Sequence, residues 1–145
     1  MYLLQFTNVV LVSLMCLGCS SNAAAPKSAD DLAIERDLFA IGNEYHAFYE
    51  ANKRSPANAK ELVAFESPEK HTEEQEHIPE LLQSTKYVVV WNADLMNYET
   101  PQGEKLLAYV KDAANGGYVC FQNTAIMKIT PKEFEEAMKK TNGIE

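Results

Sequence analysis

"DDLAIERDLFAIGNEYHAFYEANKR" runs from Asp30 to Arg54 and is the longest periodic stretch in this chain of 145 residues. Apolar side chains recur in it at helical spacing, while charged and polar residues occupy the other faces. The apolar positions are Ile34, Leu38, Ile41, Tyr45 and Phe48. The stretch therefore predicts an amphipathic helix. Because one helix cannot bury its own apolar stripe, a sheet or further helices must cover it.

Both ends of this predicted helix carry boundary signals. Ser28 or Asp30 can cap its N-terminus. Lys53 and Arg54 complement the helix dipole at the other end, and Pro56 disfavours a helical conformation in the residue before it.

The second half of the chain has a β character. Four short segments are rich in β-branched and aromatic residues and are bounded by turn residues. They are Lys86–Asn92, Lys105–Lys111, Gly117–Gln122 and Ile126–Ile129. An Asn-Gly pair within Asp112–Gly117 favours positive φ in a tight hairpin, and Asn123-Thr124 is short enough to connect the last two strands. The pattern predicts an antiparallel meander of four strands.

Three shorter helices complete the prediction. Asn58 and Glu61 have the spacing of a capping pair, and Pro79 suits the first turn of a short helix ending at Gln83. Thr130, Pro131 and Glu133 supply a cap, a first-position proline and a capping-box acid for a terminal helix that ends at about Lys140.

The predicted fold class is therefore α+β: a long N-terminal helix packed on a four-stranded antiparallel meander sheet, with short helices and a C-terminal helix. Apolar residues on both faces of the first two strands indicate that the second face is covered as well, by the terminal helix, by the acidic stretch Glu66–His77 or by another protein. The chain is long enough for one domain. Its net charge of −8 argues against nucleic acid or anionic lipid as a ligand.

The N-terminal residues have the character of an export signal. Tyr2–Leu17 is an apolar run, and the residues Gly18, Cys19 and Ser20 that follow it resemble the lipobox of bacterial lipoproteins. The position three before Cys19, usually leucine in a lipobox, is Cys16, and no Lys or Arg follows the first methionine. An uncleaved membrane anchor, or cleavage after Ala23, would use the same apolar run.

The lipobox resemblance implies three parts and a location. Residues 1–18 would be a lipoprotein signal peptide, residues 19–29 a flexible tether beginning at a lipidated Cys19, and residues 30–145 the domain. The expected location is the cell envelope, lipid-anchored at the outer membrane or a periplasmic face. The domain would then retain only Cys120 and could form no internal disulfide.

Two stretches resemble bacterial pilin-like proteins. "LFAIGNEYHAFYEANKRSPANAKELVAF" (Leu38–Phe65) is similar to the pattern L-x-x-I-G-x-A-x-x-x-Y-x-x-x-x-G-x-x-P-x-x-x-x-x-L, which occurs where the long helix ends in type II secretion major pseudopilins and in pilin-like proteins with a His-x9-Asp-Gly motif. "GGYVCFQNTAIMKITPKEF" (Gly116–Phe134) resembles the end of the second group. The resemblance implies a pilin-like α+β domain.

The chain departs from these families at their functional motifs. Asn123-Thr124 stands where the second group has Asp-Gly, and Ala113 stands where it has histidine. A basic prepilin leader and a glutamate at the fifth mature position are absent from the sequence. We therefore expect a pilin-type head carried on a lipid, and not a filament subunit.

Several side chains are candidates for chemistry, each with a simpler structural interpretation. Tyr45, His46 and Glu50 could act in acid–base catalysis, but they could equally form a solvated helix face. The cluster of His and Glu residues within Glu66–His77 has donor types suited to zinc, although acidic loops commonly have this composition. Its members are His71, Glu73, Glu74, Glu76 and His77.

Two further groups lie in or beside the predicted sheet. Oxygen ligands between the first two strands could hold calcium, as a loop does in type II secretion pseudopilins, although their spacing matches no calcium motif. These weak metal candidates are Asp94, Asn97, Glu99 and Glu104. Aromatic side chains could form an interaction surface for a sugar or a protein, or could belong to the core. They are Trp91, Tyr98, Tyr109 and Tyr118. Cys120, predicted on a strand, is more typical of a buried apolar residue than of a nucleophile.

Together these observations predict a non-enzymatic cell-envelope lipoprotein with a structural or interaction domain. No cofactor is expected, and the expected partners are a membrane, through the lipid, and an envelope protein. One alternative is an accessory, pseudopilin-like component of a secretion or pilus machine, which partial exposure of Leu38–Phe48 would favour. Another is a small periplasmic ligand- or metal-binding module, with a pocket near Asp94–Glu104 or a metal at His71 and His77.

Overall fold

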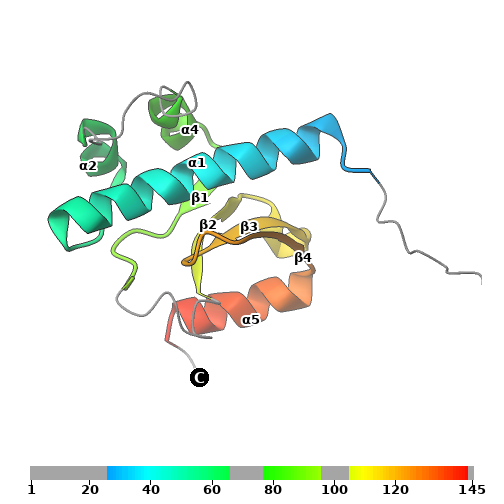
Figure 1. Cartoon of the computed structure of the whole chain (residues 1–145). Helices are drawn as coiled ribbons and strands as arrows, with labels where there is room; N and C mark the ends of the chain where they lie inside the picture. The colour runs from blue at the N-terminus through cyan, green and yellow to red at the C-terminus, as the bar shows by residue number, and fades with distance from the viewer. Residues whose placement is uncertain (1–25, 66–76, 96–104, 144–145) are drawn as a thin grey trace, which may run out of the picture.

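The computed structural model describes residues 26–65, 77–95 and 105–143, and it has the expected α+β architecture. Helix α1 (Ala29–Asn52) lies along one face of a four-stranded sheet, and helix α5 (Pro131–Thr141) lies along the other (Figure 1). Two short helices, α2 (Ala59–Ala64) and α4 (Ile78–Gln83), pack on the side of α1 that faces away from the sheet. The long helix is therefore covered on two sides.

The sheet is the predicted antiparallel meander. Its strands are β1 (Tyr87–Val89), β2 (Leu106–Val110), β3 (Gly117–Phe121) and β4 (Ile126–Ile129), and they pair in that order. A short 3₁₀ helix, η2 (Ala113–Asn115), connects β2 to β3. Each strand pairs with its neighbour in sequence, so β1 and β4 form the two edges.

The main core lies between α1 and the sheet. The predicted stripe of α1 supplies Leu38, Ile41 and Tyr45, which are fully buried, and Phe48, which is nearly so. These side chains pack with residues from β1, β2 and β3. Burial of this stripe is the main favourable term that fixes α1 on the sheet.

A second core lies between the sheet and α5. Val119 of β3 and Ile129 of β4 are buried there with Ala137 of α5, and the ring of Phe134 meets Tyr109 edge to face at 5.1 Å between centroids. The terminal helix, one of the three predicted covers, therefore packs on this face, while residues 66–76 of the acidic stretch lie outside the described residues.

A bulge in β2 lets one strand supply both cores. The register with β3 shifts between Leu106 and Ala108. Leu106 packs on the α5 side, whereas Leu107 and Ala108 both belong to the α1 side. The extra residue breaks the strict alternation of a strand and places two consecutive side chains on one face.

The helix caps follow the sequence signals. The Ser28 hydroxyl accepts a hydrogen bond from Asp31 N–H at 3.1 Å, and Thr130 and Glu133 form a second capping box at α5. At α2 the Asn58 side chain accepts from Glu61 N–H. The Glu61 carboxylate, however, accepts from Ala57 N–H instead of closing the box on Asn58, and it pairs with Arg54.

Two predicted details of the sheet were wrong. The first strand ends at Val89 instead of Asn92, because Asn92 adopts a φ of 57° and donates its N–H to the Pro56 carbonyl at 3.0 Å. The Asn115-Gly116 pair does not form a two-residue hairpin, because Asn115 ends the 3₁₀ helix and only Gly116 has a positive φ, of 93°. Asn123-Thr124 does connect β3 to β4, with Thr124 N–H bonded to the Phe121 carbonyl.

Helix α1 packs close to the sheet at Gly42. A Cβ atom at this position would lie 3.0 Å from the Cys120 sulfur on β3. Any larger side chain here would push the helix away from the strand.

Candidate functional site

The proposed acid–base group on α1 is divided between the core and the surface. Tyr45 is fully buried and donates its hydroxyl to the Val90 carbonyl at 3.1 Å, while Ala93 N–H donates to the same hydroxyl at 3.0 Å. Burial raises the pKa of Tyr45. The structure thus places Tyr45 as a link between α1 and the chain that follows β1.

His46 and Glu50 occupy a different environment from Tyr45. His46 Nε2 lies 2.6 Å from the Gln122 carbonyl oxygen, so that this nitrogen carries the proton and donates. Glu50 is exposed on the same helix. His46 thereby connects α1 to the end of β3, and the three residues do not converge on one cavity.

Replacing Tyr45 with phenylalanine tests this structural role. The change removes one donor and one acceptor from a buried position, and it leaves Ala93 N–H and the Val90 carbonyl without their hydroxyl partner. We expect the free energy of unfolding to fall by about 1–3 kcal/mol. Chemical unfolding followed by circular dichroism measures this. A Tyr45→Phe chain as stable as the wild type would show that these hydrogen bonds contribute nothing net.

Cys120 is a core residue. Its side chain is fully buried among the α1-facing residues of the sheet, and burial raises its pKa to about 12. A thiol with such a pKa is protonated at neutral pH, so it has neither the exposure nor the thiolate character of a nucleophile.

The structure describes only part of the metal candidates. Asp94 is exposed in the segment after β1, and His77 precedes α4, with its Nδ1 3.5 Å from the Glu80 carboxylate. The remaining candidates lie outside the described residues: Asn97, Glu99, Glu104, His71, Glu73, Glu74 and Glu76. Within residues 26–65, 77–95 and 105–143, no three His, Cys, Asp or Glu side chains are grouped as metal ligands.

The aromatic candidates do not share one open face. Tyr118 is buried on the α1 side of the sheet, whereas Tyr109 is half-buried against Phe134 on the α5 side. Trp91 is half-buried and stacks on Tyr45 with 6.3 Å between ring centroids. Tyr98 lies outside the described residues. Both faces of the sheet are covered, so the three described aromatics act in packing.

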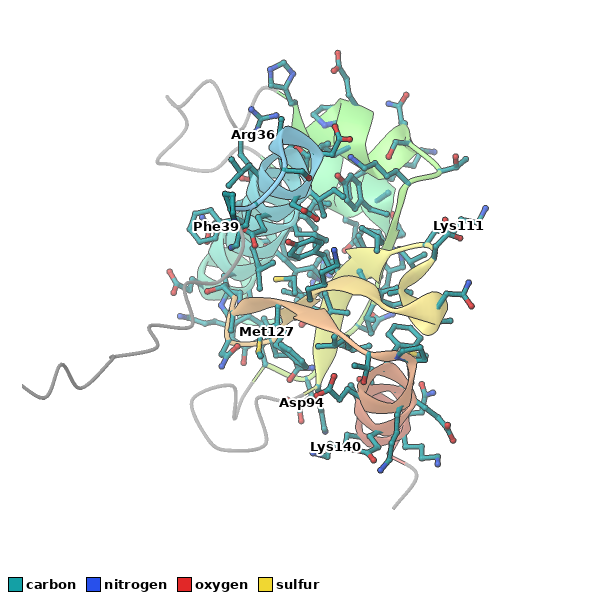
Figure 2. All side chains as sticks on the ribbon, turned by 90° about the vertical axis from the view of Figure 1, so that its right-hand side faces the viewer. Arg36, Phe39, Asp94, Lys111, Met127 and Lys140 are labelled. Carbon is teal, nitrogen blue, oxygen red and sulfur yellow. The ribbon has the colours of Figure 1, made fainter. Side chains whose placement is uncertain are left out.

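An apolar surface is present elsewhere, along the outer side of α1 next to β4. A shallow open groove of about 380 Å³ is lined by Lys27, Leu32, Glu35, Arg36, Phe39 and Ile126. Leu32 is 55% exposed and Phe39 is 44% exposed, and Met127 on β4 is 54% exposed. Met127 pairs with Val119, which packs toward α5, so its side chain lies on the other face of the sheet; Figure 2 shows Phe39 and Met127 on opposite sides of the β4 ribbon. We call Leu32, Phe39 and Ile126 the α1–β4 patch.

Ion pairs surround this patch. Lys128 Nζ lies 3.4 Å from Asp31 Oδ1 and its ammonium stands over the ring of Tyr118 at 5.3 Å, so that the first turn of α1 is tied to β4. Lys27 pairs with Glu35 across the groove, and this hydrogen bond raises the pKa of Lys27. The rim is therefore zwitterionic, in a chain whose net charge is −8.

The sequence contains a signal for this patch in addition to the buried stripe of α1. Leu32 and Phe39 are seven residues apart and flank Glu35 and Arg36, which places all four on one face of a helix. This second face is separate from the stripe of Leu38, and nothing in the spacing alone tells whether the sheet covers it.

Comparisons with known proteins give no assignment: no family model matches the chain, and no curated protein or solved structure matches it significantly. Among the described residues, no helix has both the length and the apolar character needed to cross a membrane. Cys19 and the apolar run before it lie outside the described residues.

Proposed function

We propose that this protein is a non-enzymatic cell-envelope lipoprotein whose α+β domain serves as a structural or interaction module. The observation that carries the proposal is the apolar run Tyr2–Leu17 followed directly by Gly18, Cys19 and Ser20. An apolar segment that ends in a small residue and a cysteine is typical of a signal that directs export and acylation. A pilin-like relationship of the domain is part of the proposal and rests on the sequence resemblance alone.

The packing of the domain supports a non-catalytic role. The described side chains best suited to chemistry are used inside the fold: Tyr45 and His46 link α1 to the sheet region by hydrogen bonds, and Cys120 is buried with a raised pKa. Catalytic groups usually converge on a cavity, and these point into separate contacts.

The accessory-component alternative receives less support. Partial exposure of Leu38–Phe48 would favour it, and the apolar stripe of that segment is buried, whereas Phe39 is exposed. The ligand-binding alternative placed its pocket near Asp94–Glu104, a stretch that lies largely outside the described residues. Both remain predictions.

Intact mass of the full-length chain recovered from membranes tests the proposal. For the wild type we expect loss of residues 1–18 and a mass increase equal to the acyl groups on Cys19. Cys19→Ser should lack this increase, and the chain should keep its leader or leave the membrane fraction.

Cys16→Ser provides the matched control, because it changes the other cysteine of the same segment. This variant should remain acylated if Cys19 is the modified residue. An unmodified wild-type chain, or acylation that follows Cys16 instead, would contradict the proposal.

A further inference from the structure

We infer that the α1–β4 patch is the surface that the tethered domain lays against the lipid bilayer. The inference rests on the proposed lipid anchor and deepens it, because it specifies how the domain is oriented at the membrane. Its occupant is the apolar and interfacial region of a zwitterionic bilayer, contacted by Leu32, Phe39 and Ile126.

The first support is the distribution of exposed apolar side chains. The large apolar residues exposed on the described part of the chain are Leu32, Phe39, Met127 and Val63. Two of these four, Leu32 and Phe39, line the groove of the patch, whereas Met127 lies on the α5 side of β4 and Val63 lies on α2. Ile126 extends the patch into the groove. Apolar side chains gathered on one side of a folded domain mark a contact surface more strongly than scattered ones do.

The second support is where the described chain begins. Lys27, one residue after the first described position, lines the groove itself. Seven residue steps separate Cys19 from Pro26, and a fully extended chain of that length spans at most about 25 Å. An acyl group on Cys19 would therefore hold the N-terminal half of α1 close to the bilayer surface.

The third support is charge. The charged residues that line the groove are Lys27, Glu35 and Arg36, two cations and one carboxylate, in a chain of net charge −8. Lys128 adds a further cation beside the patch, paired with Asp31. Long cationic side chains around an apolar centre suit the headgroup region of a membrane. The charges around the patch are therefore balanced, although the chain as a whole is acidic.

The tether makes a small patch sufficient. Two or three apolar side chains would bind a bilayer weakly by themselves, but a short link to an inserted acyl chain makes the second contact intramolecular. We therefore expect contact with the bilayer in the anchored protein, and only weak contact when the anchor is missing.

Quenching by brominated lipid tests the orientation. Tryptophan is introduced by Phe39→Trp, and separately by Val63→Trp as the matched control, in a full-length Trp91→Phe chain. Each chain is placed in phosphatidylcholine vesicles with or without bromine on the acyl chains. If the inference holds, bromine quenches the tryptophan of the Phe39→Trp chain roughly threefold or more strongly than that of the Val63→Trp chain. Leu32→Ser added to Phe39→Trp should reduce the difference.

The anchor is controlled separately from the orientation. Intact mass shows whether Cys19 is acylated. Where it carries a free thiol, that thiol is coupled to a maleimide lipid in the vesicles in a Cys16→Ser chain, in which the remaining cysteine, Cys120, is buried and does not compete. Missing acylation thus contradicts the proposed function, while the quenching ratio still decides the inference. If Trp91→Phe impairs folding, as judged by circular dichroism, both variants are made in the chain that retains Trp91. The quenching measured for the wild-type chain is then subtracted from that of each variant before the two are compared.

Equal quenching at both positions, or none at either, overturns the inference. A blue shift of the Phe39→Trp emission that depends on protein density and occurs without bromine quenching also overturns it, because a second copy would then cover the patch. A blue shift that is independent of protein density on the vesicles, again without bromine quenching, would mean that another segment of the same chain covers the patch. That result would also overturn the inference.

Discussion

Replacing Leu38 with alanine is expected to lower the free energy of unfolding by about 2–5 kcal/mol. Leu38 is fully buried in the core between α1 and the sheet. Its truncation removes apolar contacts and leaves a cavity that the sheet on one side and α4 on the other cannot easily fill. Chemical unfolding followed by fluorescence of Trp91, the single tryptophan of the chain, measures the change.

Leu32→Ala is the matched control, because it makes the same substitution in the same helix at a residue that is 55% exposed. We expect a change within about 0.5 kcal/mol, since little buried area is lost. Similar losses at positions 32 and 38 would contradict the assignment of the buried and exposed faces of α1.

Raising the pH above 9 is expected to destabilise the domain through Cys120. The thiol has an ordinary pKa of 9.0, and burial raises this to about 12 in the folded protein. Between these values the unfolded chain loses the proton and the folded chain keeps it, so the stabilisation is complete below pH 9 and is lost as the pH rises to 12. At about 1.4 kcal/mol per pH unit, the total loss is on the order of 4 kcal/mol.

Comparison with Cys120→Ala isolates the cysteine. Tyr45, Tyr87, Tyr109 and Tyr118 also have raised pKa values, and they begin to contribute as the pH approaches their ordinary value of 10, equally in both chains. By pH 10 the loss from Cys120 alone should be about 1.4 kcal/mol. Unfolding curves of Cys120→Ala should show a lower plateau at neutral pH and lack most of this decline. An identical decline in both chains would assign it to other groups.

Local patterns were sufficient to predict the elements and their order. The stripe of α1, the capping box at Thr130 and the strand Ile126–Ile129 depend on residues adjacent in sequence, and each is present in the structure. The pairing of β2 with β3 and of β3 with β4 follows because short connections favour pairing of neighbouring strands, whereas β1 and β2 are joined by a longer segment. The end of β1 could not be predicted in this way, because it depends on a hydrogen bond from Asn92 to Pro56 in a distant part of the chain.

Prediction of the candidate sites was limited in the same way, because local sequence does not show which distant elements pack together. Residue type correctly marked Cys120 as a core residue, but it could not tell that Tyr118 lies under the first turn of α1 and Tyr109 under α5. Leu32 and Phe39 form a visible second face on α1. Whether that face is open depends on where the edge strand β4 ends relative to the helix, and this is a tertiary property.

The position of α1 at the start of the domain affects how the chain must be made. Its buried stripe packs on strands that extend to Phe121, 69 residues after the helix ends at Asn52. At ordinary rates of translation the helix waits on the order of ten seconds for those strands to be synthesised. During that interval the apolar stripe of α1 has no native partner. We therefore expect nascent chains of this protein to depend on a chaperone more than their small size would suggest.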